Sequence, residues 1–426
     1  MPAGAARLEH MNYRVVITGI GLKTPVGNSV ESFWQSIKTS KHGMCKLAES
    51  PRYEHFSPYP EDIKIAALND EFNPLEYFEK KELRRFDPYT LLACAAAKDA
   101  LEDSKTDLKD LDPFKVGVIV GSGIGGINTF QDQHNTYLNK GPSRVSVFFI
   151  PAMISNMAAG QIAITHGFKG ANFCPVTACA SSAHAVGEAF RQIKHGYLTA
   201  AITGGAEAAT TGLALAGFNN MGALTQSDDP DRASIPFDAE RSGFVLGEGA
   251  GMLILEELSH AQARGAHIYA EIVGYGATAD AYHITSPSPD GEGAAAAMSH
   301  AIQEAGADPS EVGYINAHGT STPLNDKYET IAIKSVFGEK TPPTSSTKSM
   351  TGHMLGAAGA VEAAVCALAI ENGILPPTVG YKTPDAECDL DVVPNTAREA
   401  DIKYAISNSL GFGGHNASLA FKKYTP

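Results

Sequence analysis

The chain has 426 residues, 43% of them hydrophobic and 19% charged, with a formal net charge of −14. This composition excludes a disordered chain, and the length predicts two domains or two tightly joined halves. The acidic balance argues against nucleic acid and anionic membrane as partners, because both require a broad basic surface. No apolar run is long enough to cross a bilayer without Gly, Pro or polar breaks, so we expect no membrane partner.

The N-terminus and the cysteines bear on the compartment. Residues 1–13 lack the apolar core of a signal peptide, so we interpret them as a leader or an expression remnant and exclude them from the fold. The cysteines are too few for a disulfide scaffold and contain no CxxC pair for zinc, which favours a reducing, cytoplasmic location and no metal. The six are Cys45, Cys94, Cys174, Cys179, Cys366 and Cys388.

The first half of the chain, residues 14–265, alternates buried strands with helices. An apolar strand over 14–21 ends in glycines, and a polar, proline-containing segment over 45–74 is expected on the surface. A basic cluster over 80–85 precedes an alanine-rich helix over 89–101, and its charge pattern alone indicates a solvated helix start. This alternation predicts an α/β fold.

A buried strand over 116–120 leads into the glycine-rich string 121–126. The string matches GxGxxG, which is typical of dinucleotide binding when it follows a strand and opens a helix. We expect no clear helix directly after it, and no acidic residue ends a following strand about 20 residues later. An NAD(P)-binding oxidoreductase is therefore a remote alternative, and the glycines indicate close approach of the backbone to an unspecified group.

Cys179 lies between an extended run and a helix of small residues. Pro175 keeps the approach out of a helix, and the helix over 180–194 ends at His195 and Gly196. The thiol therefore belongs at or just before a helix N-terminus, whose N–H groups favour the thiolate and could bind an oxyanion. The alternative is a small buried hydrophobic residue, which is the commoner role of a free cysteine.

The second half, residues 266–426, repeats the pattern of the first. A strand over 270–276 echoes the opening strand, a strand over 312–319 contains His318, and a small-residue helix begins near Leu355. A duplicated β/α unit predicts two similar sheets with helices between and around them, so that equivalent loops face one cleft.

That cleft would collect Cys179, His318 and His353. A thiol with two histidines is a credible acyl-transfer set, with a nucleophile, proton donors and carbonyl polarisers. Lys348 lies in an apolar neighbourhood just before His353 and needs a partner, for which Glu362 on the following helix is available. An ordinary structural ion pair is the alternative for these two residues.

Four segments carry a family resemblance. They are Thr177–Ser182, Asn316–Pro323, Lys348–His353 and Gly411–Gly414. Their composition and order resemble the signature blocks of the β-ketoacyl-acyl-carrier-protein synthases, and the resemblance runs from Arg14 to about Lys422. Ile124, Met350 and Leu355 make the chain similar to the elongating synthase II branch of that family.

The resemblance implies a thiolase-like fold, in which two duplicated βαβ halves form a five-layered α-β-α-β-α sandwich. It also implies a decarboxylating Claisen condensation that elongates fatty acids by two carbons. Cys179 would hold the acyl chain as a thioester, while His318 and His353 hold malonyl-ACP as it loses carbon dioxide. No cofactor is implied beyond the phosphopantetheine of the acyl carrier protein (ACP), which carries both substrates.

The resemblance also assigns the remaining site residues. The N–H groups of Cys179 and Phe412 would form an oxyanion hole, Phe412 would gate the acyl pocket, and Lys348 and Glu362 would order the site around His353. The implied substrate-binding residues are Ile124 and Phe149 at the acyl pocket and Thr320 and Thr322 at the phosphopantetheine amides.

Two protein partners are implied as well. Phe149 matches a residue that closes the acyl pocket of the partner in a homodimer. A polyketide-type ketosynthase shares all four blocks and is the main alternative, whereas a thiolase is disfavoured because no cysteine follows Cys388. The implied ACP-docking residues are Lys81, Arg84 and Arg85, which match a basic helix, and Arg144 in a second patch, where Ser143 and Gly222 stand in place of arginine.

Overall fold

The computed structural model describes residues 12–426, so most of the predicted leader lies outside the described residues. Ten strands of this part form one sheet in the order β10-β9-β13-β14-β8-β1-β7-β6-β4-β5. The first half supplies β1 (Val15–Lys23), β4 (Val116–Gly121), β5 (Asn172–Phe173), β6 (Ala200–Glu207) and β7 (Gly249–Glu257). The second half supplies β8 (Ala270–Ala279), β9 (Val312–Asn316), β10 (Thr344–Ser345), β13 (Tyr404–Gly411) and β14 (His415–Lys422).

The strand order shows the duplication directly. The sequence β1-β7-β6-β4-β5 in one half is mirrored by β8-β14-β13-β9-β10 in the other, with the same parallel and antiparallel pairings. The prediction of two separate sheets needs one correction. Strands β1 and β8 pair antiparallel between Val15 and Ile272 and at the two following positions, which joins the halves edge to edge.

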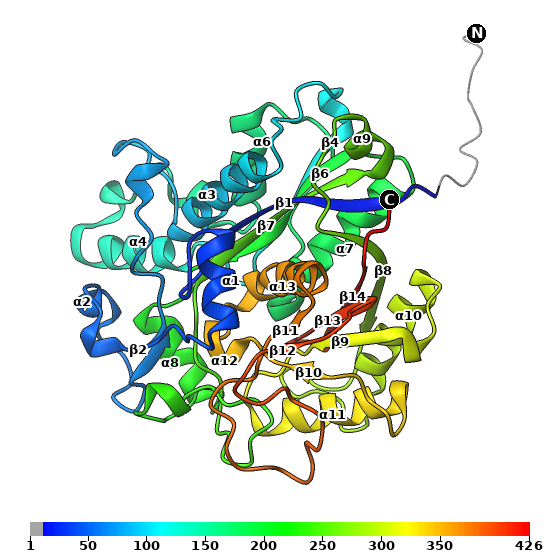
Figure 1. Ribbon diagram of the computed structural model, residues 1–426. Helices are drawn as coiled ribbons and strands as arrows, with labels where there is room; N and C mark the ends of the chain where they lie inside the picture. Colours follow the sequence, from blue (N-terminus) through cyan, green and yellow to red (C-terminus); the bar gives the residue numbers. More distant parts are fainter. Residues whose placement is uncertain (1–11) are drawn as a thin grey trace.

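Helices complete the layers (Figure 1). The central layer consists of α7 (Ser181–Lys194) and α13 (Ala358–Asn372), which contact both halves of the sheet. One outer layer holds α3 (Pro88–Asp103) and α6 (Met157–His166), and the other holds α10 (Glu292–Ala305) and α11 (Pro323–Phe337). The predicted α-β-α-β-α thiolase-like sandwich is therefore confirmed.

Glycines in the strands allow the outer helices to approach closely. A Cβ on Gly21 of β1 would lie 1.9 Å from the carbonyl oxygen of Ala96 in α3, and a Cβ on Gly276 of β8 would lie 1.9 Å from that of Ala297 in α10. Since no side chain fits at such distances, both halves depend on glycine at equivalent positions. The same small-residue packing extends into the central layer.

The segment Leu355–Asn372, which contains α13, is the candidate membrane span of the described residues by length and composition, with a mean hydropathy of 1.4. It is 89% buried, because α13 lies between the two halves of the sheet. This burial is typical of the core helix of a globular protein.

Shorter elements surround this core. The segment 45–74, predicted as irregular surface, instead contributes to a small sheet and buries Phe56, Ile63 and Leu68 in the apolar cluster around Cys179. The basic residues at 80–85 form turns before α3 begins, so the predicted basic helix is wrong in its secondary structure. The remaining elements are α1 (Val30–Lys38), α2 (Tyr53–Phe56), α4 (Ile127–Lys140), α5 (Phe149–Met153), α8 (Gly212–Asn220), α9 (Leu258–Ala263), α12 (Lys348–Thr351), β2 (Met44–Lys46), β3 (Ile65–Ala67), β11 (Ile374–Leu375) and β12 (Arg398–Glu399).

Candidate active site

Cys179 lies in a single 3-10 turn, Ala178–Ala180, directly before α7. The hydroxyl of Ser181 accepts a hydrogen bond from the N–H of Thr177 at 2.9 Å and donates one to the carbonyl of Ala178 at 2.7 Å, which closes the turn. Ala178 has a φ of 51°, in the left-handed region that costs energy for a residue with a side chain. The turn thus holds the thiol at the N-terminus of a buried helix.

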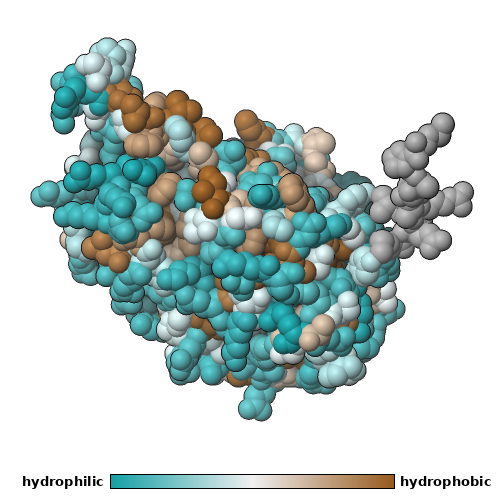
Figure 2. Space-filling model, turned by 90° about the horizontal axis from the view of Figure 1, so that it is seen from above, coloured by the Kyte–Doolittle hydropathy of each residue, from teal (hydrophilic) through white to brown (hydrophobic). Residues whose placement is uncertain are grey.

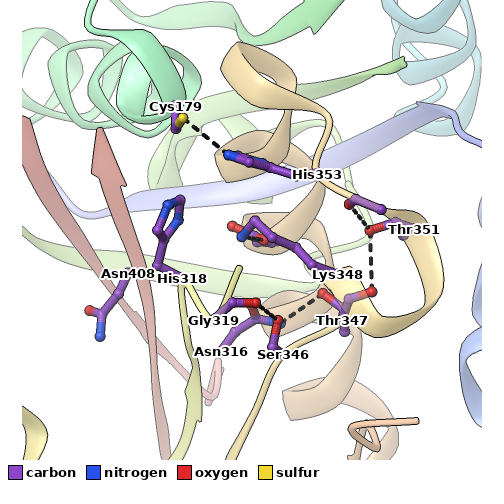
Figure 3. A network of polar contacts seen from close by, with 12 residues as sticks. Cys179, Asn316, His318, Gly319, Ser346, Thr347, Lys348, Thr351, His353 and Asn408 are labelled. Atoms are coloured by element: carbon purple, nitrogen blue, oxygen red, sulfur yellow. Dashed lines mark hydrogen bonds and ion pairs between the residues drawn. The ribbon is translucent and has the colours of Figure 1, made fainter. Parts of the chain in front are cut away.

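The thiol of Cys179 meets His353, whose Nε2 lies 3.1 Å from Sγ. Figure 3 shows this contact and places His318 on a second loop beside it. The two imidazole rings are edge to face, with centroids 5.3 Å apart and planes at 84°. The candidate ligand atoms of Cys179, His318 and His353 all lie within 4.8 Å of one another, so the structure brings together the predicted thiol and histidine pair.

Burial determines the charge of these three groups. It raises the pKa of Cys179 to about 12, although the charge of Lys348 and the backbone N–H groups of Phe412 and Cys179 act in the opposite direction. Burial, followed by the charge of Lys348, lowers the pKa of His318 and of His353 well below the ordinary value. Burial thus favours a neutral thiol and neutral imidazoles, and it opposes the helix-start thiolate expected from the sequence.

Backbone contacts fix both histidines. The N–H of His318, just beyond β9, donates to Oε1 of Glu329 at 2.8 Å, and the N–H of Gly319 donates to Oε2 at 2.8 Å. The N–H of His353 donates to the carbonyl of Val245 at 2.8 Å. The ring of Phe244 packs edge to face on His353 at a centroid distance of 5.2 Å, which restricts the imidazole further.

Lys348 begins α12 and forms a buried ion pair with Glu362 of α13. Their side chains are only 1% and 3% exposed. Among the described residues, Oε2 of Glu362 has no hydrogen-bond partner. The pair therefore places a cation beside the neutral histidines without direct contact with solvent.

A cavity of about 350 Å³ opens above the thiol. Thr320 and Thr322 line it, with their hydroxyls 3.0 Å apart, and Phe412 lines it from the loop between β13 and β14. Ile124 lies in the apolar cluster that contains Cys179 rather than in this cavity. Phe149 begins α5 and does not line the cavity of its own chain.

The thiol and the two histidines also have the donor types of a metal site. Histidines that hold a resident metal usually donate their second ring nitrogen to an acceptor. In the described part of the chain, Nδ1 of His318 and Nδ1 of His353 have no such partner. The cluster thus lacks the outer contacts that orient the ligands of a metal centre.

The backbone N–H groups of the glycine-rich string 121–126 bind a side chain of the protein itself. Helix α4 begins at Ile127, so the expectation that no helix follows the string is wrong. However, the N–H groups of Gly123, Ile124 and Gly125 all donate to the carboxylate of Glu207, at 2.7–3.2 Å. Because these donors are already satisfied inside the protein, the string does not form a dinucleotide site, which argues against the oxidoreductase alternative.

The implied docking residues lie at the surface. Lys81 is exposed and pairs with Glu79 at 2.6 Å, whereas the guanidinium of Arg85 lies 5.5 Å from the ring centroid of Phe148. Arg84 and Arg85 line one side of a second cavity of about 530 Å³. Arg144 is exposed at the end of a short 3-10 turn.

Sequence reasoning missed Glu207, Glu329 and Phe244. Each of the two glutamates is buried and accepts hydrogen bonds from the backbone of a loop at the site. The available signal for Glu207 was an acidic residue at the end of an otherwise apolar strand, which demands buried donors. Nothing in the local pattern distinguishes Phe244 from other core aromatics.

A duplicated five-layered fold with a buried thiol and two histidines at the meeting point of its halves defines a condensing enzyme of the thiolase type. Comparison with known families agrees. Residues 12–261 match the β-ketoacyl synthase N-terminal domain and residues 269–382 match the β-ketoacyl synthase C-terminal domain. The chain belongs to the β-ketoacyl synthase family.

Curated relatives extend over almost the whole chain. The chain is 50% identical over 415 residues to a 3-oxoacyl-[acyl-carrier-protein] synthase 2 of Staphylococcus aureus (strain N315), covering 97% of this chain and 99% of the relative. It is 48% identical over 414 residues to a protein of the same name from Synechocystis sp., covering 96% and 98% of the two chains.

Solved structures show the same fold. A β-ketoacyl synthase from Burkholderia phymatum STM815 matches with a TM-score of 0.89 and 34% identity, covering 97% of this chain and all of that one. A type II PKS acyl-carrier protein in complex with its ketosynthase, bound to the hexaketide, matches with a TM-score of 0.88, 34% identity and coverage of 97% and 100%.

Proposed function

We propose that this chain is an elongating β-ketoacyl-ACP synthase, which condenses malonyl-ACP with an acyl chain held on Cys179 and lengthens fatty acids by two carbons. The observation that carries the proposal is the contact of 3.1 Å between Sγ of Cys179 and Nε2 of His353, with His318 beside it. The sequence identity of 48–50% to proteins named 3-oxoacyl-[acyl-carrier-protein] synthase 2 favours fatty-acid synthesis over a polyketide pathway.

The first step transfers the acyl group. The sulfur of Cys179 attacks the thioester carbonyl of acyl-ACP, and the phosphopantetheine sulfur leaves and takes up the proton that the thiol loses. The backbone N–H groups of Cys179 and Phe412 both lower the pKa of the thiol, so they lie close enough to stabilise negative charge there. The same two donors would stabilise the oxyanion of the tetrahedral intermediate.

The second step uses the histidines. Malonyl-ACP enters with its thioester carbonyl oxygen against Nε2 of His318 and of His353, and loss of carbon dioxide leaves an enolate that these donors stabilise. The enolate carbon attacks the acyl carbonyl on Cys179, and the C–S bond breaks to release β-ketoacyl-ACP. The thiolate then takes a proton and returns to the neutral resting thiol. No cofactor is required beyond phosphopantetheine, whose amides would bind Thr320 and Thr322.

We also propose two macromolecular partners and a location. The basic residues Lys81, Arg84 and Arg85 are exposed or line a surface cavity, which suits docking of an acidic ACP by an otherwise acidic enzyme. Phe149 and the apolar segment around it, with Val147 and Ile150 at 87% and 56% exposure, would form a homodimer interface. Figure 2 shows apolar side chains gathered toward one corner of the molecule. The six free cysteines favour the cytoplasm.

Separate assays of the two steps test this function. In His318→Ala and His353→Ala, decarboxylation of malonyl-ACP should fall by about 100-fold or more, the usual cost of losing a positioned oxyanion donor. Acylation of Cys179 by acyl-ACP should change much less. Retained decarboxylation in both variants would contradict the assigned roles.

A further inference from the structure

Glu207 is a buried carboxylate that the two steps above do not use. It ends β6 and is 0% exposed. Its Oε1 accepts hydrogen bonds from the hydroxyl of Ser122 at 2.9 Å and from the N–H groups of Ile124 and Gly125 at 3.2 Å each. Its Oε2 accepts from the N–H groups of Gly123 at 2.7 Å and Gly356 at 3.1 Å. Five converging donors favour the ionised form, whereas burial raises the pKa of Glu207.

The donors come from two loops that reach the thiol. The glycine-rich loop carries Ile124, and the 3-10 turn Leu355–Ala357 carries Gly356 just after His353. Ile124 and Leu355 belong to the apolar cluster that surrounds Cys179. The carboxylate of Glu207 is therefore the common acceptor of two walls around the acylated residue.

The two loops press together with no space for a side chain. A Cβ on Gly356 would lie 2.3 Å from the backbone nitrogen of Gly123 and 2.7 Å from Oε2 of Glu207. The loop around Gly123 also touches the nucleophile turn, since a Cβ there would lie 3.1 Å from the carbonyl oxygen of Ala178. A shift of any one loop would thus disturb the others.

The duplication gives this arrangement a structural origin. The turn with Cys179 precedes α7, and the turn with Gly356 precedes α13 at the equivalent place in the second half. The first residues of both turns, Ala178 and Leu355, have left-handed φ values of 51° and 45°. The first half uses this helix start to hold a nucleophile, whereas the second half uses it to donate an N–H to Glu207.

We propose that Glu207 is a positioning residue that sets the acyl-chain preference, because it holds Ile124 and Leu355 against the space that the chain on Cys179 must enter. This inference rests on the proposed function. Ile124 packs against the apolar cluster that contains Cys179 and Leu355, so an acyl chain that extends from Cys179 into this cluster must displace it. A firmly held glycine loop resists that displacement, and a loosened loop permits it.

Glu207→Gln loosens the loop with little change in shape. Whichever way the amide is oriented, its NH₂ group faces at least two backbone N–H donors that lose their acceptor. We expect the ratio of kcat/KM for tetradecanoyl-ACP to that for hexanoyl-ACP to rise by about tenfold. Glu256→Gln is the matched control, because Glu256 is equally buried but pairs with Thr18 and Arg264 away from the site. It should lose stability without changing the ratio.

A double-mutant cycle separates positioning from a general structural effect. In an Ile124→Ala background the wall is already missing, so Glu207→Gln should change the ratio by less than about twofold. Ser122→Ala removes a single donor and should shift the ratio in the same direction by a smaller factor, which tests the idea even if Glu207→Gln does not fold. An unchanged ratio in the folded variants would overturn the proposal. A shift of the ratio by Glu207→Gln that is as large in the Ile124→Ala background as in the unaltered background would overturn it too.

Two further readouts keep this test distinct from that of the proposed function. Alkylation of Cys179 by iodoacetamide, a reagent too small to need the wall, should not be slower in Glu207→Gln than in the unaltered protein, because the charge of Glu207 raises the pKa of the thiol and its loss favours the reactive thiolate. Failure of the unaltered protein to accept any acyl chain on Cys179 would reject the proposed function itself. Normal acylation with an unchanged chain-length ratio in the variants would reject only the role of Glu207.

Discussion

Replacing Lys348 with methionine is expected to destabilise the protein by about 3–5 kcal/mol, because it leaves the charge of Glu362 buried without its cation. The side chains of Lys348 and Glu362 are 1% and 3% exposed, so water cannot take the place of the lost partner. Within the described residues, Oε2 of Glu362 already lacks a hydrogen bond, which leaves the carboxylate dependent on the ammonium group.

The same substitution changes the histidines. The positive charge of Lys348 lowers the pKa of both His318 and His353, in addition to the effect of burial. Its removal should raise both pKa values, so the acidic limb of the pH profile for malonyl-ACP decarboxylation should move to higher pH. A purely structural pair would affect the unfolding midpoint without moving this limb.

Urea unfolding at pH 7 checks the energetic part. The comparison includes Lys348→Met, Glu362→Leu and the double variant that combines these two changes. The double variant should lose less unfolding free energy than Lys348→Met alone, because it removes both buried charges, whereas Lys348→Met leaves one of them buried and unpaired. A Lys348→Met protein as stable as the unaltered one, or a double variant as costly as the sum of the two single changes, would refute the reasoning.

Two further predictions concern docking and pH. Replacing Lys81, Arg84 and Arg85 with glutamate should raise the KM for acyl-ACP and flatten the dependence of this KM on salt. Unchanged kinetics would show that these residues belong to an ordinary solvated surface and do not dock ACP. Burial raises the pKa of Glu329 to about 7, so its contribution to stability is complete below the ordinary value of 4.5 and is lost as the pH rises through 7. Glu329→Gln should remove about 3 kcal/mol of pH dependence across this window, and an unaltered slope would contradict the shift.

The main features of the fold could be predicted because the duplication is visible in local patterns of the sequence. Strands that end in glycines and helices of small residues recur in both halves, and each pattern depends on neighbours close in sequence. The junction between β1 and β8 could not be predicted in this way. It depends on three residue pairs between strands about 250 residues apart, and the apolar pattern of either strand would suit a sheet edge equally well.

The residue types of the site could be predicted from the sequence. The prediction failed for those properties of the site that depend on long-range contacts. Cys179 at a helix start follows from Pro175 and the small-residue helix, but its raised pKa results from burial in an apolar cluster, to which the segment 45–74, placed on the surface by its composition, contributes several residues. The glycine-rich string was correctly linked to a close backbone approach. Its occupant, Glu207, lies on a strand some 80 residues away, and only the folded sheet brings them together.

Mass spectrometry of the protein after incubation with a long-chain acyl-ACP tests the central claim most directly. The account predicts one acyl group per chain, attached through a thioester to Cys179, with release of an equal amount of free ACP thiol. Replacement of Cys179 by alanine should abolish the adduct. An acyl group on any other residue, or no adduct at all, would contradict the account.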